Sequence, residues 1–201
     1  MFENQNHNEK MKKLKTSKQK IFAKKTEKKG LIIVNTGTGK GKSTAAFGMV
    51  FRGIAHGMPC AVVQFIKGAM ATGERDLIQH HFHELCEFHT LGDGFTWDTQ
   101  DKEKDIASAK KAWSKAKELI SDEKKKIILL DEINIALRYG YIEIDDVVTF
   151  LQEKKPEMSH VILTGRNADE KLINIADLVT DMTLVKHHFR NGVMSQAGIE
   201  F

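Results

Sequence analysis

A glycine-rich stretch that ends in lysine and serine is the clearest chemical signal in the chain. It covers residues 35–44 (Asn-Thr-Gly-Thr-Gly-Lys-Gly-Lys-Ser-Thr) and follows the apolar run 31–34. Glycines let successive backbone N–H groups turn toward phosphate oxygens, and the start of a following helix adds its dipole. We therefore expect a phosphate-binding loop between a strand and a helix, with Lys42 against the phosphates and Ser43 on a Mg²⁺ ion.

The loop departs from the usual Walker A pattern at its first position, where Thr36 replaces glycine. A turn that merely joins a strand to a helix is the alternative, but both elements lie where a phosphate loop needs them. We expect the phosphates of a nucleotide to be held by the loop residues Thr36, Gly37, Thr38, Gly39, Lys40, Gly41, Lys42, Ser43 and Thr44.

A pair of carboxylates at the end of an apolar run is the second signal. Asp131 and Glu132 close the run 126–132, as in a Walker B segment, and one of them would reach Mg²⁺ directly or through water. Ordinary acids at a strand end are the alternative, which the loop upstream disfavours. Another apolar run, 160–166, ends in Arg166 at the same edge, where this side chain would reach an anionic ligand.

The elements that must position these residues alternate between strands and helices. Strands are expected at 31–34, 60–66, 86–91, 126–132, 160–166 and 178–185, and helices at 43–56, 76–83, 101–121, 144–155 and up to residue 176. Short, nearly continuous apolar runs are typical of strands that are buried on both faces. The order predicts an α/β fold with a mostly parallel sheet and helices on both faces. Its ligand edge lies at the carboxyl ends of the strands, with loop 67–75 facing the site.

The loop 92–98 (Gly-Asp-Gly-Phe-Thr-Trp-Asp) carries two large aromatic side chains in a polar neighbourhood. Phe95 and Trp97 either fill the core from a loop or make one wall of a pocket for a flat, apolar ligand. The sequence alone favours a place in the hydrophobic core for Phe95 and Trp97.

The histidines and cysteines give no metal signature. His80, His81 and His83 are near neighbours on a polar helix, without a carboxylate at ligand spacing, and we expect them on the solvated surface. Cys60 and Cys86 lie far apart in apolar segments. We expect two free thiols, no disulfide and no zinc site.

The positive charge of the chain is concentrated at its start. Residues 1–30 hold ten lysines and three glutamates, whereas the whole chain of 201 residues carries a net charge of only +4. This segment is a docked or partner-bound helix, a disordered leader or a nucleic-acid arm. Partly helical spacing favours the helix, and the lack of interleaved aromatics makes nucleic-acid binding unlikely. The apolar residues with that spacing are Met11, Leu14, Ile21 and Phe22.

We expect residues 1–29 to form a basic helical extension and residues 30–201 to form one α/β domain. No apolar run has the length of a membrane span, and the lysine-rich start lacks the apolar core of a signal peptide. A cytoplasmic location without membrane attachment is therefore expected.

Taken together, these stretches resemble one family, the P-loop ATP:corrinoid adenosyltransferases, also called cob(I)alamin adenosyltransferases. The phosphate loop is shared with many NTPases, but GFTW and the KH…GIE ending are far more specific, and Thr36 matches the family's variant loop. The resemblance covers nearly the whole chain beyond residue 30. It is carried by residues 36–48 (TGTGKGKSTAAFG), 63–68 (VQFIKG), 73–75 (GER), 94–100 (GFTWDTQ), 130–133 (LDEI), 139–141 (YGY), 164–166 (TGR), 185–187 (VKH) and 198–201 (GIEF).

The resemblance implies a P-loop NTPase-like fold of the RecA type and a defined reaction. Such enzymes transfer the 5′-deoxyadenosyl group of ATP to the Co(I) centre of cobalamin or a corrinoid precursor and release triphosphate. They bind the triphosphate in reverse relative to ordinary P-loop enzymes, so that the ribose C5′ faces the corrinoid. The resemblance also implies a homodimer, an N-terminal helix that lies over the active site, and a flavoprotein-type electron donor.

Residue roles follow from the same resemblance. Catalysis would rest on Lys42 and Glu132, and Mg²⁺ would be held by Ser43 with Glu132 or Asp131. Phe95 and Trp97 would form the hydrophobic wall that displaces the lower ligand of the corrinoid. Two other classes of protein stay open. An ATPase or kinase would use Glu132 to activate water or a hydroxyl group, and a nucleic-acid-dependent motor would use the lysine-rich segment.

Overall fold

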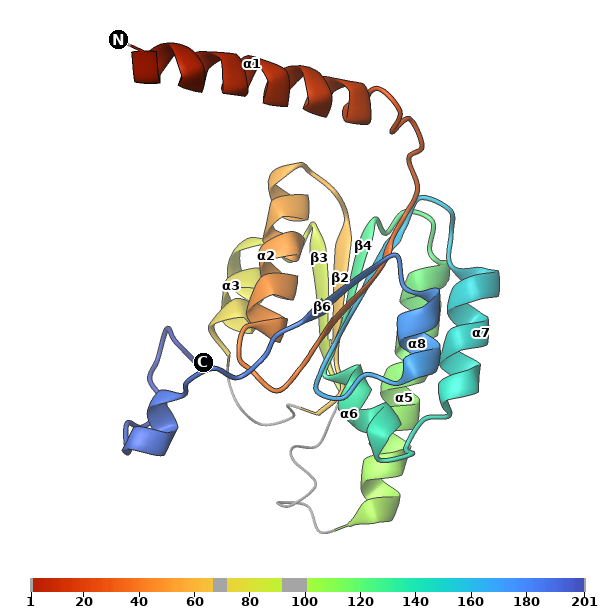
Figure 1. The fold of residues 1–201 in the computed structure, drawn as a ribbon. Helices are drawn as coiled ribbons and strands as arrows, with labels where there is room; N and C mark the ends of the chain where they lie inside the picture. Colours follow the sequence, from red (N-terminus) through yellow and green to blue (C-terminus); the bar gives the residue numbers. More distant parts are fainter. Residues whose placement is uncertain (1, 67–71, 92–100, 201) are drawn as a thin grey trace.

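The computed structural model describes residues 2–66, 72–91 and 101–200 (Figure 1). Within these ranges the centre of the molecule is a sheet with the strand order β3-β2-β4-β5-β1-β6, in which all neighbouring strands are parallel. The mostly parallel sheet that we expected is thus parallel throughout. Its strands are β1 (Ile32–Thr36), β2 (Cys60–Gln64), β3 (Cys86–Thr90), β4 (Ile127–Asp131), β5 (His160–Thr164) and β6 (Leu178–Asp181).

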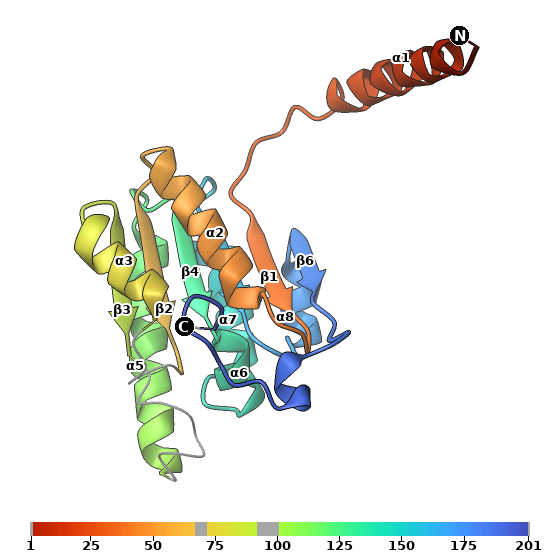
Figure 2. The same ribbon diagram turned by 90° about the vertical axis from the view of Figure 1, so that its left-hand side faces the viewer.

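Helices cover both faces of this sheet, as Figures 1 and 2 show. One face packs against α2 (Lys42–Ala55) and α3 (Gly73–His81). The other face packs against α5 (Lys102–Ser121), α6 (Ile133–Arg138), α7 (Ile144–Lys154) and α8 (Glu170–Ile175). The α/β class with helices on both faces, expected from the alternation of patterns, is confirmed.

The central strands β1, β2, β4 and β5 are mainly apolar and are buried on both faces, with polar residues at their carboxyl ends. Successive side chains of a strand point to opposite faces. In β1, Ile32 and Val34 therefore join the core beneath α5 to α8, whereas Ile33 joins the core beneath α2 and α3. This arrangement fixes the strands rigidly and brings their carboxyl ends to one edge.

Several element limits differ from the expected ones. The last strand ends at Asp181 rather than near residue 185, because the chain leaves the sheet there and crosses the glycine-rich loop, where Gly39 N–H donates to Met182 O (2.6 Å). The helix expected from residue 76 starts at Gly73, since the hydroxyl of Thr72 caps it by accepting from Arg75 N–H (3.4 Å). The short α6 and a 3₁₀ turn, η1 (His188–Asn191), were not expected.

The N-terminal segment is helical over residues 2–22, as the partly helical spacing of its apolar residues favours. Helix α1 (Phe2–Phe22) projects away from the sheet in Figures 1 and 2, and the side chains of residues 7–29 are exposed. Docking of this helix over a site stays a prediction. Among the described residues, no helix combines the length and the hydropathy needed to cross a membrane.

Both cysteine thiols are free and buried. Cys60 and Cys86 lie opposite each other in the register of β2 and β3. Burial raises the pKa of Cys60 to about 11 and the pKa of Cys86 to about 12, so both thiols stay protonated and act as small apolar side chains. The side chains of the near-neighbour histidines, His80, His81 and His83, are exposed as expected.

Candidate active site

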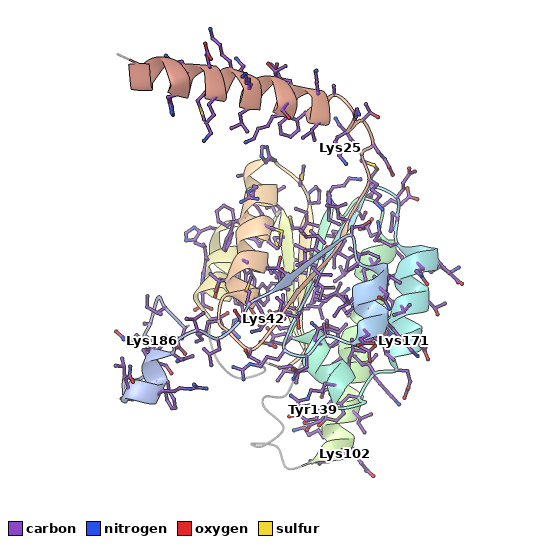
Figure 3. The ribbon with its side chains drawn as sticks, viewed as in Figure 1. Lys25, Lys42, Lys102, Tyr139, Lys171 and Lys186 are labelled. Carbon is purple, nitrogen blue, oxygen red and sulfur yellow. The ribbon has the colours of Figure 1, made fainter. Side chains whose placement is uncertain are left out.

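A cavity of about 570 Å³ lies at the carboxyl edge of the sheet, beside the start of α2. Figure 3 labels Lys42 at this position. The cavity is lined by the glycine-rich loop from Gly39 to Thr44, by the start of α3, by Glu132 and Arg166, and by residues near the end of the chain. Parallel α/β sheets place their ligands at this edge.

The conformation of the glycine-rich loop requires glycine at three positions, for two different reasons. Gly37 has φ +101° and Gly41 has φ +106°, values that residues with a Cβ adopt only under strain. A Cβ on Gly39 would also lie 2.6 Å from the carbonyl oxygen of Thr183. Part of the glycine requirement therefore comes from the chain that follows β6, and not from a phosphate group alone.

Lys42 places a cationic group inside this loop. Only 7% of the residue is exposed, and its Nζ donates to the carbonyl oxygen of Gly39. Burial is the largest cause of the lowered pKa of Lys42; Glu132 opposes the shift, and Arg166 adds to it. A cation that is poorly hydrated and held beside the N-terminus of α2 attracts an anion strongly.

The two adjacent carboxylates are placed very differently. Asp131 is fully buried, and its two oxygens accept from the hydroxyl of Thr164 (2.8 Å) and the amide of Gln64 (3.1 Å). Glu132 adopts the left-handed conformation (φ +63°), which turns the chain out of β4, and its side chain lines the cavity. The structure thus brings Glu132, and not Asp131, to Lys42 and Arg166.

The start of the loop does not line the cavity. The hydroxyl of Thr36 accepts from Ala168 N–H (3.0 Å), and the hydroxyl of Thr38 accepts from Leu184 N–H (3.3 Å). Thr36 therefore ties β1 to the segment that carries Arg166, which explains a threonine at this position. Ser43, Thr44 and Arg166 do line the cavity, and their contacts with a nucleotide or a metal ion stay a prediction.

Sequence reasoning missed most of the apolar side of the cavity. The spacing of Phe47 and Phe51 by four residues signals a common face of α2, and both line the cavity. Leu77 and Ile135 do so as well. Of the loop expected at 67–75, residues 67–71 lie outside the described residues, whereas Thr72 and the first two residues of α3, Gly73 and Glu74, line the cavity.

The end of the chain also reaches the cavity, a contact that no local pattern predicts. Glu200 lines it, forms an ion pair with Lys40 (2.6 Å), and has its other oxygen 3.0 Å from His188 Nε2. The hydrogen bond from Lys40 is the largest cause of the lowered pKa of Glu200. Phe95 and Trp97 lie outside the described residues, so their place at the site stays a prediction.

Comparisons with known proteins point to one family. A family model described as "ATP:corrinoid adenosyltransferase BtuR/CobO/CobP" matches residues 28–201. A corrinoid adenosyltransferase of Sinorhizobium sp. is 67% identical over 195 residues, which are 97% of this chain and 91% of that protein. A corrinoid adenosyltransferase of Pseudomonas aeruginosa is 46% identical over 98% of this chain and 96% of its own length. One of Escherichia coli K12 is 42% identical over 89% of each chain.

The chain belongs to this adenosyltransferase family. It therefore transfers the adenosyl group of ATP to a corrinoid, and the cavity beside Lys42 is the candidate site of that transfer. The family assignment decides among the three classes left open by the residues, in favour of the transferase. The cavity has both charged and apolar lining residues, which suits ATP, because ATP carries both a polyanionic triphosphate and a flat base.

Proposed function

We propose that the cavity binds MgATP with its phosphates at the glycine-rich loop, and that the Co(I) centre of the corrinoid attacks the ribose C5′. The electron pair of Co(I) forms the Co–C bond, while the C5′–O bond breaks and its electron pair leaves with an intact triphosphate. Cobalt gives up no proton in this step, so no general base is required. The observation that carries the proposal is the convergence of Lys42, Glu132 and Arg166 on one cavity at the N-terminus of α2.

Stabilisation of the leaving group is the main task of the protein. Negative charge grows on the triphosphate as the C5′–O bond breaks, so cations and N–H groups that are already in place lower the barrier. Lys42 is held by the loop itself, and its low hydration leaves its charge available to the phosphates. Arg166 adds a second cation from the end of β5.

A Mg²⁺ ion fits the donors present. Hard cations prefer oxygen ligands, and the hydroxyl of Ser43 and the carboxylate of Glu132 both line the cavity. Bound there, the ion would supply positive charge that offsets the charge of the phosphates. We assign direct coordination to Ser43 and Glu132. Asp131 is assigned to position the end of β4 through Thr164 and Gln64.

We further propose that Phe95 and Trp97 form the apolar wall that displaces the lower ligand of the corrinoid. A flavoprotein-type donor would supply the electron that generates Co(I). The working unit would be a cytoplasmic homodimer in which α1 covers an active site. The exposed apolar side chains of α1, among them Ile21 and Phe22, support a partner for this helix.

Paired variants of the two acids test the metal assignment. Glu132→Gln should raise the Mg²⁺ concentration needed for half-maximal turnover roughly 10- to 100-fold, a range typical of weakened metal sites. Asp131→Asn keeps the shape of the side chain but offers an amide N–H₂ to a buried donor, so it should lower the melting temperature and leave the Mg²⁺ requirement unchanged. Mn²⁺ binding measured by EPR with ATP present reads the metal affinity directly. A shifted metal affinity in Asp131→Asn alone would reverse the assignment.

A further inference from the structure

A carboxylate lies in the cavity that binds a polyanion. The side chain of Glu200 is only 16% exposed and sits 2.6 Å from Lys40 Nζ, a cation of the glycine-rich loop. His188 Nε2 lies 3.0 Å from its other oxygen. An acidic group at this place repels phosphate, so its presence calls for a function of its own.

The C-terminal segment, residues 182–200, carries Glu200 to this position in two stages. The segment is first fixed to the outside of the loop, where Met182 O accepts from Gly39 N–H (2.6 Å) and Leu184 N–H donates to Thr38 Oγ1 (3.3 Å). It then returns so that the end of the chain lies beside the start of α2 in Figures 1 and 2. A last turn, with Glu200 N–H bonded to Gln196 O (3.0 Å), places the carboxylate in the cavity.

The two stages differ in how firmly they hold. The first uses backbone groups packed against glycines that leave no room for a Cβ. The second rests on the ion pair between Glu200 and Lys40, and Lys40 is 47% exposed, a setting in which such a pair contributes little. Side chains between the two stages, such as Val185 and Met194, are largely exposed, at 93% and 78%. The final residues can therefore be released while the first stage stays in place.

We propose that Glu200 is a placeholder for phosphate. Before the nucleotide binds, the Glu200 carboxylate pairs with Lys40 and so holds residues 193–200 over the cavity. The triphosphate group of ATP has more charge and more oxygens than one carboxylate. It then displaces Glu200 from Lys40, and this end of the chain is released. Glu200 is thus a positioning residue that acts through Lys40. The inference rests on the phosphate site assigned under the proposed function.

Binding of inorganic tripolyphosphate to the full-length chain, followed by calorimetry, tests the placeholder without any corrinoid. Glu200→Gln should bind tripolyphosphate about two- to fivefold more tightly, the gain expected when a competing exposed ion pair is removed. The gain should vanish in the Lys40→Gln background, because the competition runs through Lys40. Glu153→Gln removes an exposed carboxylate of α7 and should bind as the unaltered chain does.

Hydrogen exchange gives a readout that separates a placeholder from a permanent clip. In the unaltered chain, tripolyphosphate should speed the exchange of amides in residues 193–200, whereas in Glu200→Gln these amides should exchange fast from the start. Equal or weaker binding by Glu200→Gln, or slower exchange of residues 193–200 on addition of tripolyphosphate, overturns the placeholder and leaves the phosphate site intact. An unaltered chain that binds no tripolyphosphate overturns the phosphate site and the placeholder together.

Discussion

The charged side chain of Lys42 is almost inaccessible to solvent, and we expect this residue to contribute most to the stabilisation of an anion at the site. Its Nζ is fixed by the carbonyl oxygen of Gly39, and its backbone carbonyl accepts from the side chain of Asn35 (3.2 Å). Both ends of the residue are thus held before any ligand arrives. A charge in fixed position stabilises a leaving anion without the cost of reorganisation.

Lys42→Ala should lower kcat/KM for ATP by on the order of a hundredfold or more, the usual cost of losing one well-placed charge-stabilising donor. The melting temperature should stay close to that of the unaltered chain, because the variant removes a poorly hydrated charge from a buried position. Lys171→Ala is the matched control, since Lys171 is an exposed lysine of α8 paired with Asp145 (2.6 Å). Turnover of Lys42→Ala within twofold of the control would refute the role of Lys42.

Residue types predicted the chemistry of the site, but they did not separate Asp131 from Glu132. Both acids follow the same apolar run, so a local pattern treats them alike. The difference depends on Thr164, which is far away in sequence. Its hydroxyl donates to one oxygen of Asp131 and accepts from the backbone N–H of Glu132. A contact between two strands of this kind becomes visible only once the sheet is assembled.

At the scale of elements, the phosphate loop is held from both sides. Strand β1 and helix α2 determine its ends, and the chain after β6 packs against its glycines. The first constraint was predictable, because strand, loop and helix are continuous in sequence. The second was not, since it depends on where β6 ends, and an exposed edge strand has too weak an apolar pattern to locate its end.

Residues 92–98, which carry Phe95 and Trp97, have a proposed role that is best tested by varying the oxidation state of cobalt at the start of the reaction. Removal of the lower ligand makes Co(II) easier to reduce, because that ligand raises the energy of the orbital that receives the electron. If Phe95 and Trp97 displace the ligand, Phe95→Ala with Trp97→Ala should slow turnover from Co(II) and a biological reductant far more than turnover from prereduced Co(I). ATP affinity should change little.

The same double variant tests the alternative that these aromatics belong to the core. Loss of two buried aromatic side chains would cost roughly 3–5 kcal/mol each and lower the melting temperature by many degrees. Both turnover assays would then fall equally. Measuring melting temperature beside the two assays therefore separates the two roles in one set of samples.

On the scale of the whole molecule, α1 projects away from the sheet (Figures 1 and 2). Its apolar side chains Met11, Leu14, Ile21 and Phe22 are between 41% and 69% exposed. The position of this helix was not predictable, because an amphipathic pattern indicates that a helix has a partner but does not identify the partner.

Deletion of residues 1–29 should weaken corrinoid turnover and leave ATP binding intact, because the nucleotide cavity is built from later residues. If the same segment supports the homodimer that we propose, light scattering should give a lower molar mass per particle for the truncated chain than for the full-length chain. Full turnover by the truncated chain, with loss of a salt-dependent affinity for DNA or RNA, would instead identify the segment as a basic arm.

The products of the reaction test the central claim most directly. The purified chain is incubated without oxygen with ATP, Mg²⁺ and chemically reduced cobalamin, and the phosphorus NMR spectrum is followed beside the visible spectrum. Attack at C5′ leaves all three phosphates joined, so inorganic triphosphate should accumulate in a one-to-one ratio with the adenosylated corrinoid. Stoichiometric ADP and phosphate, with no adenosylated corrinoid, would contradict the account.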